Sequence, residues 1–574
     1  MSALPPTGVS RRAFLSRVGQ VGGYAASFAT MQSLGLLPMK SAEAAPIQAT
    51  GGSGKGVKVV VLGGGPGGLV SAYELKKLGY DVTLLEARSR PGGRCWTGRK
   101  GDKVEFVDGT VQPITWDEGN YQNMGPARIP SVHGTMLGYC RELEIPLEVE
   151  INSSRSTFLQ NDAANGGAPV LQRKAINDTR GHVSELLSKC ILGGALDQEL
   201  SGEDRERMIS FLRIYGDLAQ GNRYTGGTGR AGYKVEPGAG KQVGVPPVPL
   251  DMKVLLDENF WGNMLFEDVW DWQATMMQPV GGIDRIAYAF AKALGPIIHY
   301  NSPVTVVKRT DKGVAVTYTQ NGATKHLEAA YCVVALPFEI LKKLDHDLSP
   351  AVKAVIDGSK PAGSYKIAWE SRRFWEQDYN IYGGLEFVNT GCSPIWFPSA
   401  GMFSERGIVV SGYTDETNLP FGKLTIPEKF AESRKSIERL HPGHGKELEK
   451  PMYVGWGKIP YNEGSWIRAY GPNQNRSPEQ NQGPMAPAPG TTPPGVTLTP
   501  QTGQARNAGA ARTQTNPGYE TLLQPDGPII FAGDHVSHIV AWQEGAALSA
   551  LRAVSQLTDR TKAARLAKIG LISA

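Results

Sequence analysis

The sequence predicts a mixed α/β fold built around a parallel, Rossmann-like sheet, and three segments carry this prediction. Residues 57–86 read as a strand, a glycine-rich turn, a helix and a second strand that ends in an acidic residue. Residues 331–336 and 529–534 are two further short apolar runs, and the second of them also ends in an acid. Short, almost continuous apolar runs are typical of buried strands in parallel sheets.

The first segment contains the βαβ dinucleotide fingerprint, with its glycine turn at residues 63–68 and its terminal acid at Glu86. Gly63 permits the tight turn, Gly65 lets the backbone approach a pyrophosphate, and Gly68 lets the helix pack closely on the sheet. The pyrophosphate is expected at the helix N-terminus, where free N–H groups favour an anion. Glu86 is expected to accept hydrogen bonds from the ribose hydroxyls. The segment therefore predicts a dinucleotide site.

Length and composition limit the remaining possibilities. A chain of 574 residues is ample for two interleaved domains with a sizeable core. The net charge is only +5 and no basic cluster indicates nucleic acid binding. No run is long and apolar enough to span a membrane. The five cysteines are widely spaced, so neither a disulfide framework nor a metal site is predicted.

The first 45 residues read as a targeting segment. Residues 10–15, Ser-Arg-Arg-Ala-Phe-Leu, look like a twin-arginine signal, and Ala42-Glu43-Ala44 is a small-residue cleavage site before Ala45. We expect export by the twin-arginine route to the periplasm or the outside of the cell, with no stable membrane anchor after cleavage. The alternative is an amphipathic or disordered tail.

Four segments resemble the flavin amine oxidase family. The turn after Glu86, which ends in Gly92-Gly93-Arg94, is similar to the turn that lies against FAD in that family. Residues 123–130, Asn-Met-Gly-Pro-Ala-Arg-Ile-Pro, resemble the segment of L-amino acid oxidases whose arginine holds the substrate carboxylate. Residues 277–286 contain the family's Pro-x-Gly-Gly turn, and residues 529–546 resemble its terminal FAD motif.

The resemblance implies a Rossmann-like FAD-binding domain made from discontinuous segments, a mixed-sheet substrate-binding domain and a helical domain. The implied boundaries are 1–45 for the signal peptide, 55–130, 276–345 and 519–565 for the FAD-binding domain, 131–275 for the helical domain and 346–470 for the substrate-binding domain. Residues 471–518 are rich in Pro, Gly and Gln and contain few large apolar groups. They cannot bury enough surface to offset chain entropy, so we expect a flexible surface insertion.

The helical region carries two local predictions. Residues 201–204, Ser-Gly-Glu-Asp, resemble a capping box with Asp in place of Glu or Gln. The helix that follows has an apolar face at helical spacing, which we expect to be core: Met208, Phe211, Leu212 and Tyr215. The Gly/Pro-rich residues 221–249 are expected to form an ordered loop or a lid.

The resemblance places FAD against residues from both ends of the chain. These residues are Gly63, Gly65, Pro66, Gly67, Gly68, Glu86, Ala87, Arg88, Gly93, Arg94, Met124, Gly125, Ala127, Arg128, Val304, Gly533, Asp534, Ala541 and Trp542. Glutamate is more usual than Asp534 at its position, so the ribityl contact is expected to be shorter or water-mediated. Some relatives tether the flavin through a cysteine near the position of Gly464, but no cysteine follows Cys392. Non-covalent binding is therefore expected.

The resemblance also implies the substrate site. Arg128 matches the arginine that holds the substrate carboxylate, and its planar fork of donors suits that task. Lys366 matches the lysine that holds a water against flavin N5, and a lysine in an apolar strand is costly without partners. The implied catalytic and substrate-binding residues are Arg128, Lys366, Tyr413, Trp466, Ala541 and Trp542. The alternatives are a surface arginine, a solvent-facing lysine on an edge strand and a core tryptophan.

By resemblance, the activity is FAD-dependent oxidative deamination of L-amino acids. Hydride passes from the substrate Cα to flavin N5, the imino acid hydrolyses to a 2-oxo acid and ammonia, and molecular oxygen is reduced to hydrogen peroxide. Aromatic walls favour large apolar or aromatic side chains. No acid occupies a matched pocket position, although residues 160–275 could supply one.

The partners implied are a small L-amino acid and oxygen, with no nucleic acid, in a homodimer. Three alternatives remain open. An amine or polyamine oxidase shares the FAD motifs but has no need of Arg128. An amino acid 2-monooxygenase has the same fold. A flavoprotein that only binds would not need an aromatic pocket with Lys366.

Overall fold

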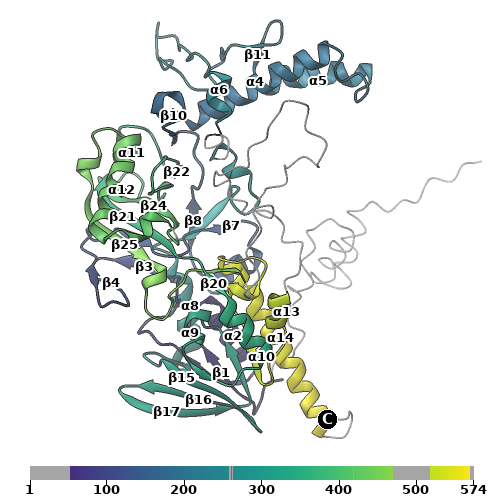
Figure 1. Ribbon diagram of the computed structural model, residues 1–574, viewed down its shortest axis with the longest axis vertical. Coiled ribbons are helices and arrows are strands. Elements are labelled where there is room, and N and C mark those ends of the chain that lie inside the picture. Colours follow the sequence, from purple (N-terminus) through teal and green to yellow (C-terminus); the bar gives the residue numbers. More distant parts are fainter. Residues whose placement is uncertain (1–51, 258–259, 261–262, 418, 470–516, 569–574) are drawn as a thin grey trace, which may run out of the picture. The chain divides into compact units, whose positions relative to one another are not determined.

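The structure is a computed structural model, and it describes residues 52–257, 260, 263–417, 419–469 and 517–568 (Figure 1). The predicted signal segment lies outside these residues, as does the predicted insertion up to residue 516. No helix in the described ranges is long and apolar enough to cross a membrane. Within the same ranges, no three His, Cys, Asp or Glu side chains gather as they would around a metal ion.

A five-stranded parallel sheet forms the base of the nucleotide-binding region. In spatial order its strands are β14 (Ile298–His299), β2 (Asp81–Leu85), β1 (Lys58–Leu62), β18 (Tyr331–Val334) and β27 (Ile529–Phe531). Every neighbouring pair is parallel. The strands are apolar because both faces of the sheet are covered. The predicted Rossmann-like sheet, assembled from distant segments, is confirmed.

Three helices pack together beside this sheet, and the first of them begins at the glycine-rich turn. The helix α2 (Pro66–Lys77) follows β1 directly and packs against α14 (Gln543–Lys568) and α8 (Asp284–Leu294). In Figure 1 the labels of α2, α8 and α14 lie close to that of β1. The first and last parts of the described chain therefore lie side by side at the start of α2.

A four-stranded sheet, in which the first two strand pairs are antiparallel and the last pair is parallel, packs on the same core. Its strand order is β17 (Ala323–Ala329), β16 (Gly313–Gln320), β15 (Val304–Thr310) and β19 (Asp345–His346). Val307, Val314 and Val316 from this sheet join Leu62 and Val334 in one buried cluster. The packing places the start of β15, and so Val304, at the edge of the parallel sheet.

A second five-stranded sheet lies in the predicted substrate-binding domain. Its order is β22 (Gly384–Glu386), β23 (Ile395–Phe397), β24 (Arg406–Asp415), β21 (Ser364–Arg372) and β25 (Glu449–Gly455). Its strand pairs are antiparallel, and a parallel bridge between Leu159 and Phe387 lies next to the end of β22. The mixed character predicted for this sheet is therefore limited to the parallel bridge beside its edge strand β22.

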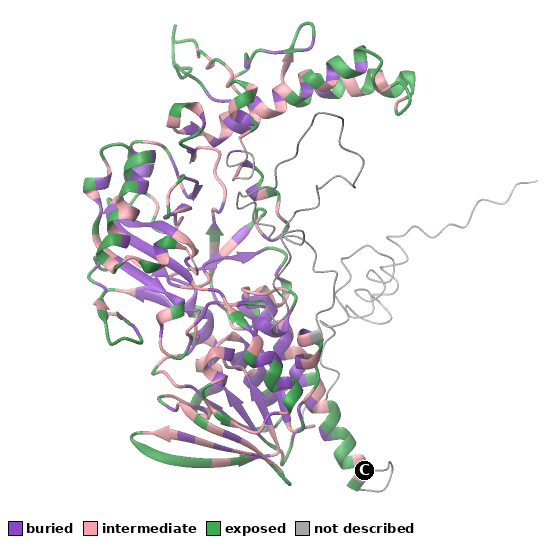
Figure 2. Cartoon of the chain, in the orientation of Figure 1, coloured by how far each residue is buried: buried purple, intermediate pink, exposed green. Residues whose placement is uncertain are grey.

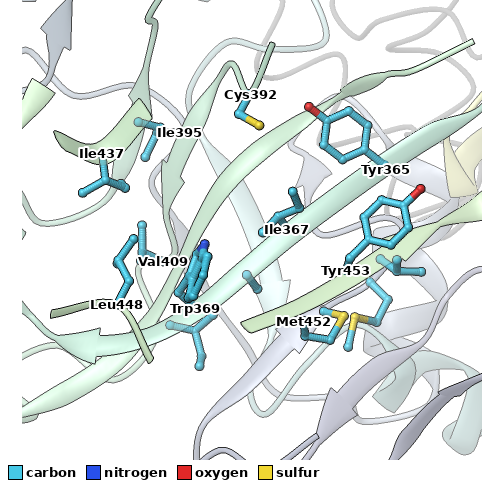
Figure 3. Close-up of a cluster of buried hydrophobic side chains, with 14 of the residues drawn as sticks. Tyr365, Ile367, Trp369, Cys392, Ile395, Val409, Ile437, Leu448, Met452 and Tyr453 are labelled. Atoms are coloured by element: carbon cyan, nitrogen blue, oxygen red, sulfur yellow. The ribbon is translucent and has the colours of Figure 1, made fainter. Parts of the chain in front are cut away.

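The strand β21 is buried on both faces. Figure 3 shows its residues Tyr365, Ile367 and Trp369 among Val409 and Met452 of the neighbouring strands. The helix α12 (Ile426–Leu440) contacts β24. A strand enclosed in this way buries any polar side chain that it carries, and Lys366 is such a residue.

Short strands link the two regions. One three-stranded sheet has the order β7 (Ile129–Pro130), β13 (Met276–Pro279) and β8 (Leu147–Glu150), and a two-stranded sheet pairs β3 (Thr97–Arg99) with β6 (Tyr121–Asn123). Arg128 comes immediately before β7, and Glu150 ends β8. These strands therefore bring both charged residues to Trp396 of β23.

The helical region consists of α3 (Gly134–Glu142), α4 (Gln172–Leu192), α5 (Gly202–Tyr215) and α6 (Met252–Leu255). Ser201 caps α5: the Asp204 amide donates to Ser201 Oγ at 3.1 Å, and Ser201 Oγ donates to Asp204 Oδ2 at 2.7 Å. The predicted cap at Ser201 is therefore present, and the Ser201 and Asp204 side chains are hydrogen-bonded to each other.

The prediction of a core face on α5 is wrong. Only Leu212 of the four residues is buried, whereas Phe211 is 55% and Tyr215 is 44% exposed, and their rings stack on each other at 5.2 Å. Figure 2 shows much of α5 as exposed. Within the described residues the helix contacts chiefly α4 and β11 (Leu218–Ala219), and these leave most of its apolar side exposed. Helical periodicity reveals an apolar face but not what covers it.

Candidate active site

A cavity of about 700 Å³ lies at the carboxyl end of the parallel sheet. Its wall includes residues that directly or closely follow four of the strands: Gly63 after β1, Glu86 after β2, Ala335 after β18 and Gly533 after β27. Ligands of open α/β sheets bind outside the carboxyl ends of the strands. The cavity is therefore where a nucleotide cofactor is expected.

The glycine turn shapes the cavity beside α2. Gly63 has a φ of +97°, which favours glycine, and a Cβ on Gly68 would lie 1.9 Å from the Gly63 carbonyl oxygen. A Cβ on Gly65 would meet no atom within 4 Å, and Gly65 lines the cavity. The backbone at Gly65, which precedes the first residue of α2, is thus open to a ligand at the helix N-terminus. This geometry suits a pyrophosphate.

The residues after β2 form the next part of the wall. Glu86 is buried and accepts hydrogen bonds from the Gly64 and Arg88 amides at 2.7 and 2.8 Å. The Arg88 guanidinium donates to Asn462 Oδ1 at 2.6 Å, and burial lowers its pKa. Ala87 and Val304 also line the cavity. Glu86 is therefore held with its carboxylate at the wall, where ribose hydroxyls are expected.

Residues from three distant segments meet at the other end of the cavity. Arg94 and Asp534 form an ion pair, and the Ala541 amide donates to Asp534 Oδ2 at 3.1 Å. Burial raises the pKa of Asp534, but the Arg94 guanidinium holds it below its ordinary value. A Cβ on Gly125 would lie 2.2 Å from the Arg94 carbonyl oxygen. The predicted cofactor residues Arg94, Gly125, Asp534 and Ala541 thus lie together.

Arg128 lies in a cage of aromatic rings. It is 3% exposed, and its guanidinium carbon is 4.7 Å from the ring centre of Trp396, 4.9 Å from Trp272 and 5.8 Å from Tyr413. Its Nη1 donates to Asn152 Oδ1, and Asn152 Nδ2 donates to the Trp272 carbonyl oxygen at 3.2 Å. The alternative of a surface arginine does not hold. The cage fixes the plane of the guanidinium.

Lys366 shares two of these rings. It is 2% exposed, and its Nζ lies 4.8 Å from the ring centre of Tyr413 and 5.3 Å from that of Trp396. Nζ donates to the carbonyl oxygens of Asn123 at 2.7 Å and Gly125 at 2.6 Å. The strand β21 is an inner strand, so Lys366 is not a solvent-facing lysine on an edge strand.

Glu150 is the carboxyl group near Arg128 and Lys366. Trp396 Nε1 and Ser399 Oγ donate to its two oxygens at 3.0 and 2.7 Å. Burial raises the pKa of Glu150 to about 7, although Arg128 and the hydrogen bonds that Glu150 accepts from Ser399 and Trp396 oppose that shift. Burial, reinforced by Arg128, lowers the pKa of Lys366 well below its ordinary value. The site therefore contains one permanent cation, Arg128, and two groups whose charge is strongly disfavoured by burial.

Trp542 extends the aromatic wall. Its ring centre lies 5.5 Å from that of Trp272 and 4.9 Å from that of His133. Its Nε1 donates to Asp271 Oδ2 at 2.7 Å. The rings around Arg128 and the predicted flavin-side tryptophan thus form one continuous surface through Trp272.

Trp466 lies in another place. It borders a small cavity together with Arg94, Asp534 and Ser465, and so belongs to the cofactor side of the site. The structure therefore brings Tyr413, Trp542 and Arg128 to one wall and leaves Trp466 outside it.

Several residues of this site were not predicted from the sequence. They are His133, Glu150, Asn152, Asp271, Trp272 and Trp396. One signal was present: residues 270–272 read Trp-Asp-Trp, and two tryptophans around an acid are an unusual choice for a solvent-exposed loop. The others have no pattern that distinguishes them from ordinary core residues.

Comparison with known proteins agrees with this geometry. The sequence model of the family described as flavin containing amine oxidoreductase matches residues 66–558. The flavin-dependent L-tryptophan oxidase of Lentzea aerocolonigenes is 24% identical over 535 residues, which cover 87% of this chain and 97% of that protein. An L-amino acid oxidase of Bothrops pictus is 25% identical over 376 residues, covering 63% of this chain and 69% of the relative.

Solved structures show the same fold. Cyclohexylamine oxidase from Brevibacterium oxydans superposes with a TM-score of 0.54 at 14% identity, and putrescine oxidase with bound putrescine has a TM-score of 0.51 at 17% identity. Each likeness covers 88% of this chain and 99% of the other chain. Because the family match extends over most of the sequence and the cavity has the expected glycine cradle, this chain belongs to the flavin-containing amine oxidoreductase family.

Proposed function

We propose that this flavoprotein is an FAD-dependent L-amino acid oxidase. An L-amino acid with a large side chain, oxygen and water would be converted to a 2-oxo acid, ammonia and hydrogen peroxide. The observation that carries the proposal is the caged guanidinium of Arg128, 3% exposed beside Trp272, Trp396 and Tyr413. A plain amine has no group for that guanidinium to bind.

The chemistry of Arg128 favours an amino acid over an amine. Arg128 brings a permanent charge to a wall of aromatic rings, and a rigid guanidinium binds a carboxylate through two parallel hydrogen bonds. Asn152 and the rings hold Arg128 in one orientation, which reduces the cost of ordering it on binding. The relatives named as L-tryptophan and L-amino acid oxidases support the same reading.

FAD is the proposed cofactor, and the cavity fits it. The glycine cradle at Gly63 and Gly65 would hold the pyrophosphate, Glu86 the ribose, and the end with Arg94 and Asp534 the ribityl chain. When bound, the flavin supplies a two-electron acceptor for oxidation of the substrate Cα–N bond. None of the described residues that line either cavity is a cysteine, so we propose that the cofactor is bound non-covalently.

The protein residues would bind and orient the substrate. Arg128 would hold the carboxylate, and Trp272, Trp396 and Tyr413 would exclude water around it. Lys366, whose pKa burial lowers well below its ordinary value and whose Nζ donates to the Asn123 and Gly125 carbonyl oxygens, would hold a water at Nζ. Holding the carboxylate and the side chain leaves one position for the Cα hydrogen, which would select the L-isomer.

Peroxide release from the purified yellow protein tests the proposal. L-phenylalanine and L-leucine should support peroxide formation with equimolar ammonia, while D-phenylalanine and 2-phenylethylamine should not. Comparable rates with 2-phenylethylamine would instead identify an amine oxidase. A product that is the amide one carbon shorter, with little peroxide, would identify a monooxygenase.

A further inference from the structure

Asp271 is the acidic side chain that the structure adds to the aromatic wall. It is 8% exposed, and Trp542 Nε1 donates to its Oδ2 at 2.7 Å. Its other oxygen, Oδ1, is buried and has no hydrogen-bond partner among the described residues. A buried carboxylate oxygen without a partner costs free energy comparable to a lost hydrogen bond, so each case needs an explanation.

The surroundings of Asp271 are aromatic and provide no cation. Trp542 contacts Trp272 and His133 edge-on, and His133 lies 6.5 Å from the ring centre of Trp270. No described Lys or Arg side chain forms an ion pair with Asp271 or affects its pKa, which burial raises. Burial lowers the pKa of His133 to about 4, so this ring is neutral at physiological pH. The anion therefore lacks a counter-charge from the described chain.

Two tryptophans in contact, Trp542 and Trp272, connect Asp271 with Arg128. Trp272 follows Asp271 in the chain, lies 4.9 Å from the Arg128 guanidinium carbon and meets Trp542 at 5.5 Å. A cation and an anion thus flank one pair of tryptophans. A ligand with a carboxylate at one end and a cation at the other would match both charges, and the rings between them favour a cation as well as apolar methylene groups.

We propose that Asp271 determines side-chain specificity and accepts the N–H groups of a cationic side-chain end, an ammonium or a guanidinium. This inference rests on the proposed function, because it needs Arg128 to hold the α-carboxylate. It makes long basic L-amino acids, the arginine and lysine class, the favoured substrates. The expectation of apolar preference rested on the matched pocket positions, which contain no acid, and left open an acid from residues 160–275. We propose that Asp271, which accepts from Trp542 Nε1, is that acid.

Neutral isosteres provide the test. L-arginine and L-citrulline have nearly the same shape, but only L-arginine is cationic, and L-lysine pairs with L-2-aminoheptanoate in the same way. The expected kcat/KM ratio of L-arginine to L-citrulline is on the order of 100-fold in the wild type, the cost of leaving a buried charge unpaired. In Asp271→Asn the ratio should fall close to one, although an oxygen remains for Trp542.

The matched control is Asp268→Asn, which removes the same charge from an exposed position three residues earlier. This variant should keep the wild-type ratio. A wild-type ratio near one would overturn the proposal. So would an Asp271→Asn variant that loses activity on both substrates equally, because Asp271 would then only position Trp542.

A binding measurement separates this inference from the proposed activity. Calorimetry with 5-guanidinopentanoate and the neutral 5-ureidopentanoate uses ligands without an α-amine, which cannot be deaminated. The wild type should bind the guanidinium compound more tightly by a similar factor, and this result does not depend on any variant folding. Equal affinities would overturn the inference even if the enzyme releases peroxide. Preferential binding without peroxide from any L-amino acid would instead contradict only the proposed oxidase activity.

Discussion

At the residue scale, we expect Arg128 to distinguish an amino acid from a plain amine. Arg128→Ala should lower kcat/KM for L-amino acids by a factor equivalent to a loss of about 3–5 kcal/mol of transition-state stabilisation, because a buried, charge-assisted contact to the carboxylate is lost. Arg128→Lys should recover only part of it, since lysine keeps the charge without the planar fork. Steady-state peroxide assays with L-phenylalanine and 2-phenylethylamine measure the difference. Equal losses for both compounds would show that Arg128 only supports the fold.

Glu150 gives the site a pH dependence that can be measured through stability. Its pKa is about 7 in the folded protein, against 4.5 for an ordinary glutamate. Below pH 4.5 both folded and unfolded chains are protonated at this residue. Between these values the unfolded chain loses its proton while the folded chain keeps it, so the free energy of unfolding falls as pH rises and levels off above about pH 7.

Glu150→Gln should remove this decline. The Tm of the wild type minus that of Glu150→Gln should decrease from pH 5 to pH 8, measured by thermal unfolding in matched buffers. Glu118→Gln, at an exposed position, serves as the control and should show a difference that stays constant. A constant difference for Glu150→Gln as well would mean that the carboxylate is already ionised at pH 5.

At the scale of elements, the contact between α2 and the glycine turn controls cofactor binding. A Cβ on Gly68 would lie 1.9 Å from the Gly63 carbonyl oxygen, so Gly68→Ala must move the helix away from the turn. The purified variant should contain much less flavin per protein, as measured by the ratio of absorbance near 450 nm to absorbance near 280 nm, where oxidised flavins and aromatic side chains absorb. Lys77→Ala, at the exposed end of the same helix, should retain its flavin. Full occupancy in Gly68→Ala would show that close packing is dispensable.

The helix α12 depends on its N-terminal cap. Thr425 Oγ1 accepts from the Glu428 amide, and Glu428 Oε2 accepts from the Thr425 amide at 2.8 Å, which completes a capping box. Thr425→Ala should lower the free energy of unfolding by about 1 kcal/mol. Denaturant titration followed by far-ultraviolet circular dichroism measures it. Because α12 contacts β24 of the substrate sheet, an unchanged midpoint would mean that tertiary packing alone holds the helix.

At the scale of the whole molecule, non-covalent cofactor binding and export are both testable. Acid precipitation should release FAD into the supernatant, because the described cavity walls contain no cysteine to form a thioether. Yellow colour retained in the pellet would contradict non-covalent binding.

We also propose twin-arginine export, so replacement of Arg11 and Arg12 by lysine should keep the protein in the cytoplasmic fraction. Unchanged fractionation would remove the basis for the signal.

The sequence by itself determined the nucleotide half of this protein. Gly63, Gly65 and Gly68 each have a role that follows from local backbone geometry, and Glu86 follows its strand at the position that the motif requires. Such features repeat over a few adjacent residues, so they can be read without knowing the fold. Arg128 and Lys366 were found from resemblance, and their burial agrees with functional roles.

Only the tertiary structure decided the make-up of the predicted substrate site. Trp272 lies more than one hundred residues before Trp396 and Tyr413 in the chain, yet all three surround one guanidinium, and a long-range contact of this kind leaves no local pattern. For the same reason α5 was assigned a buried face that it does not have, because periodicity describes one helix and burial depends on its neighbours. Asp271 shows the consequence for function. An acid in a loop becomes a candidate specificity residue only when the fold buries it against Trp542.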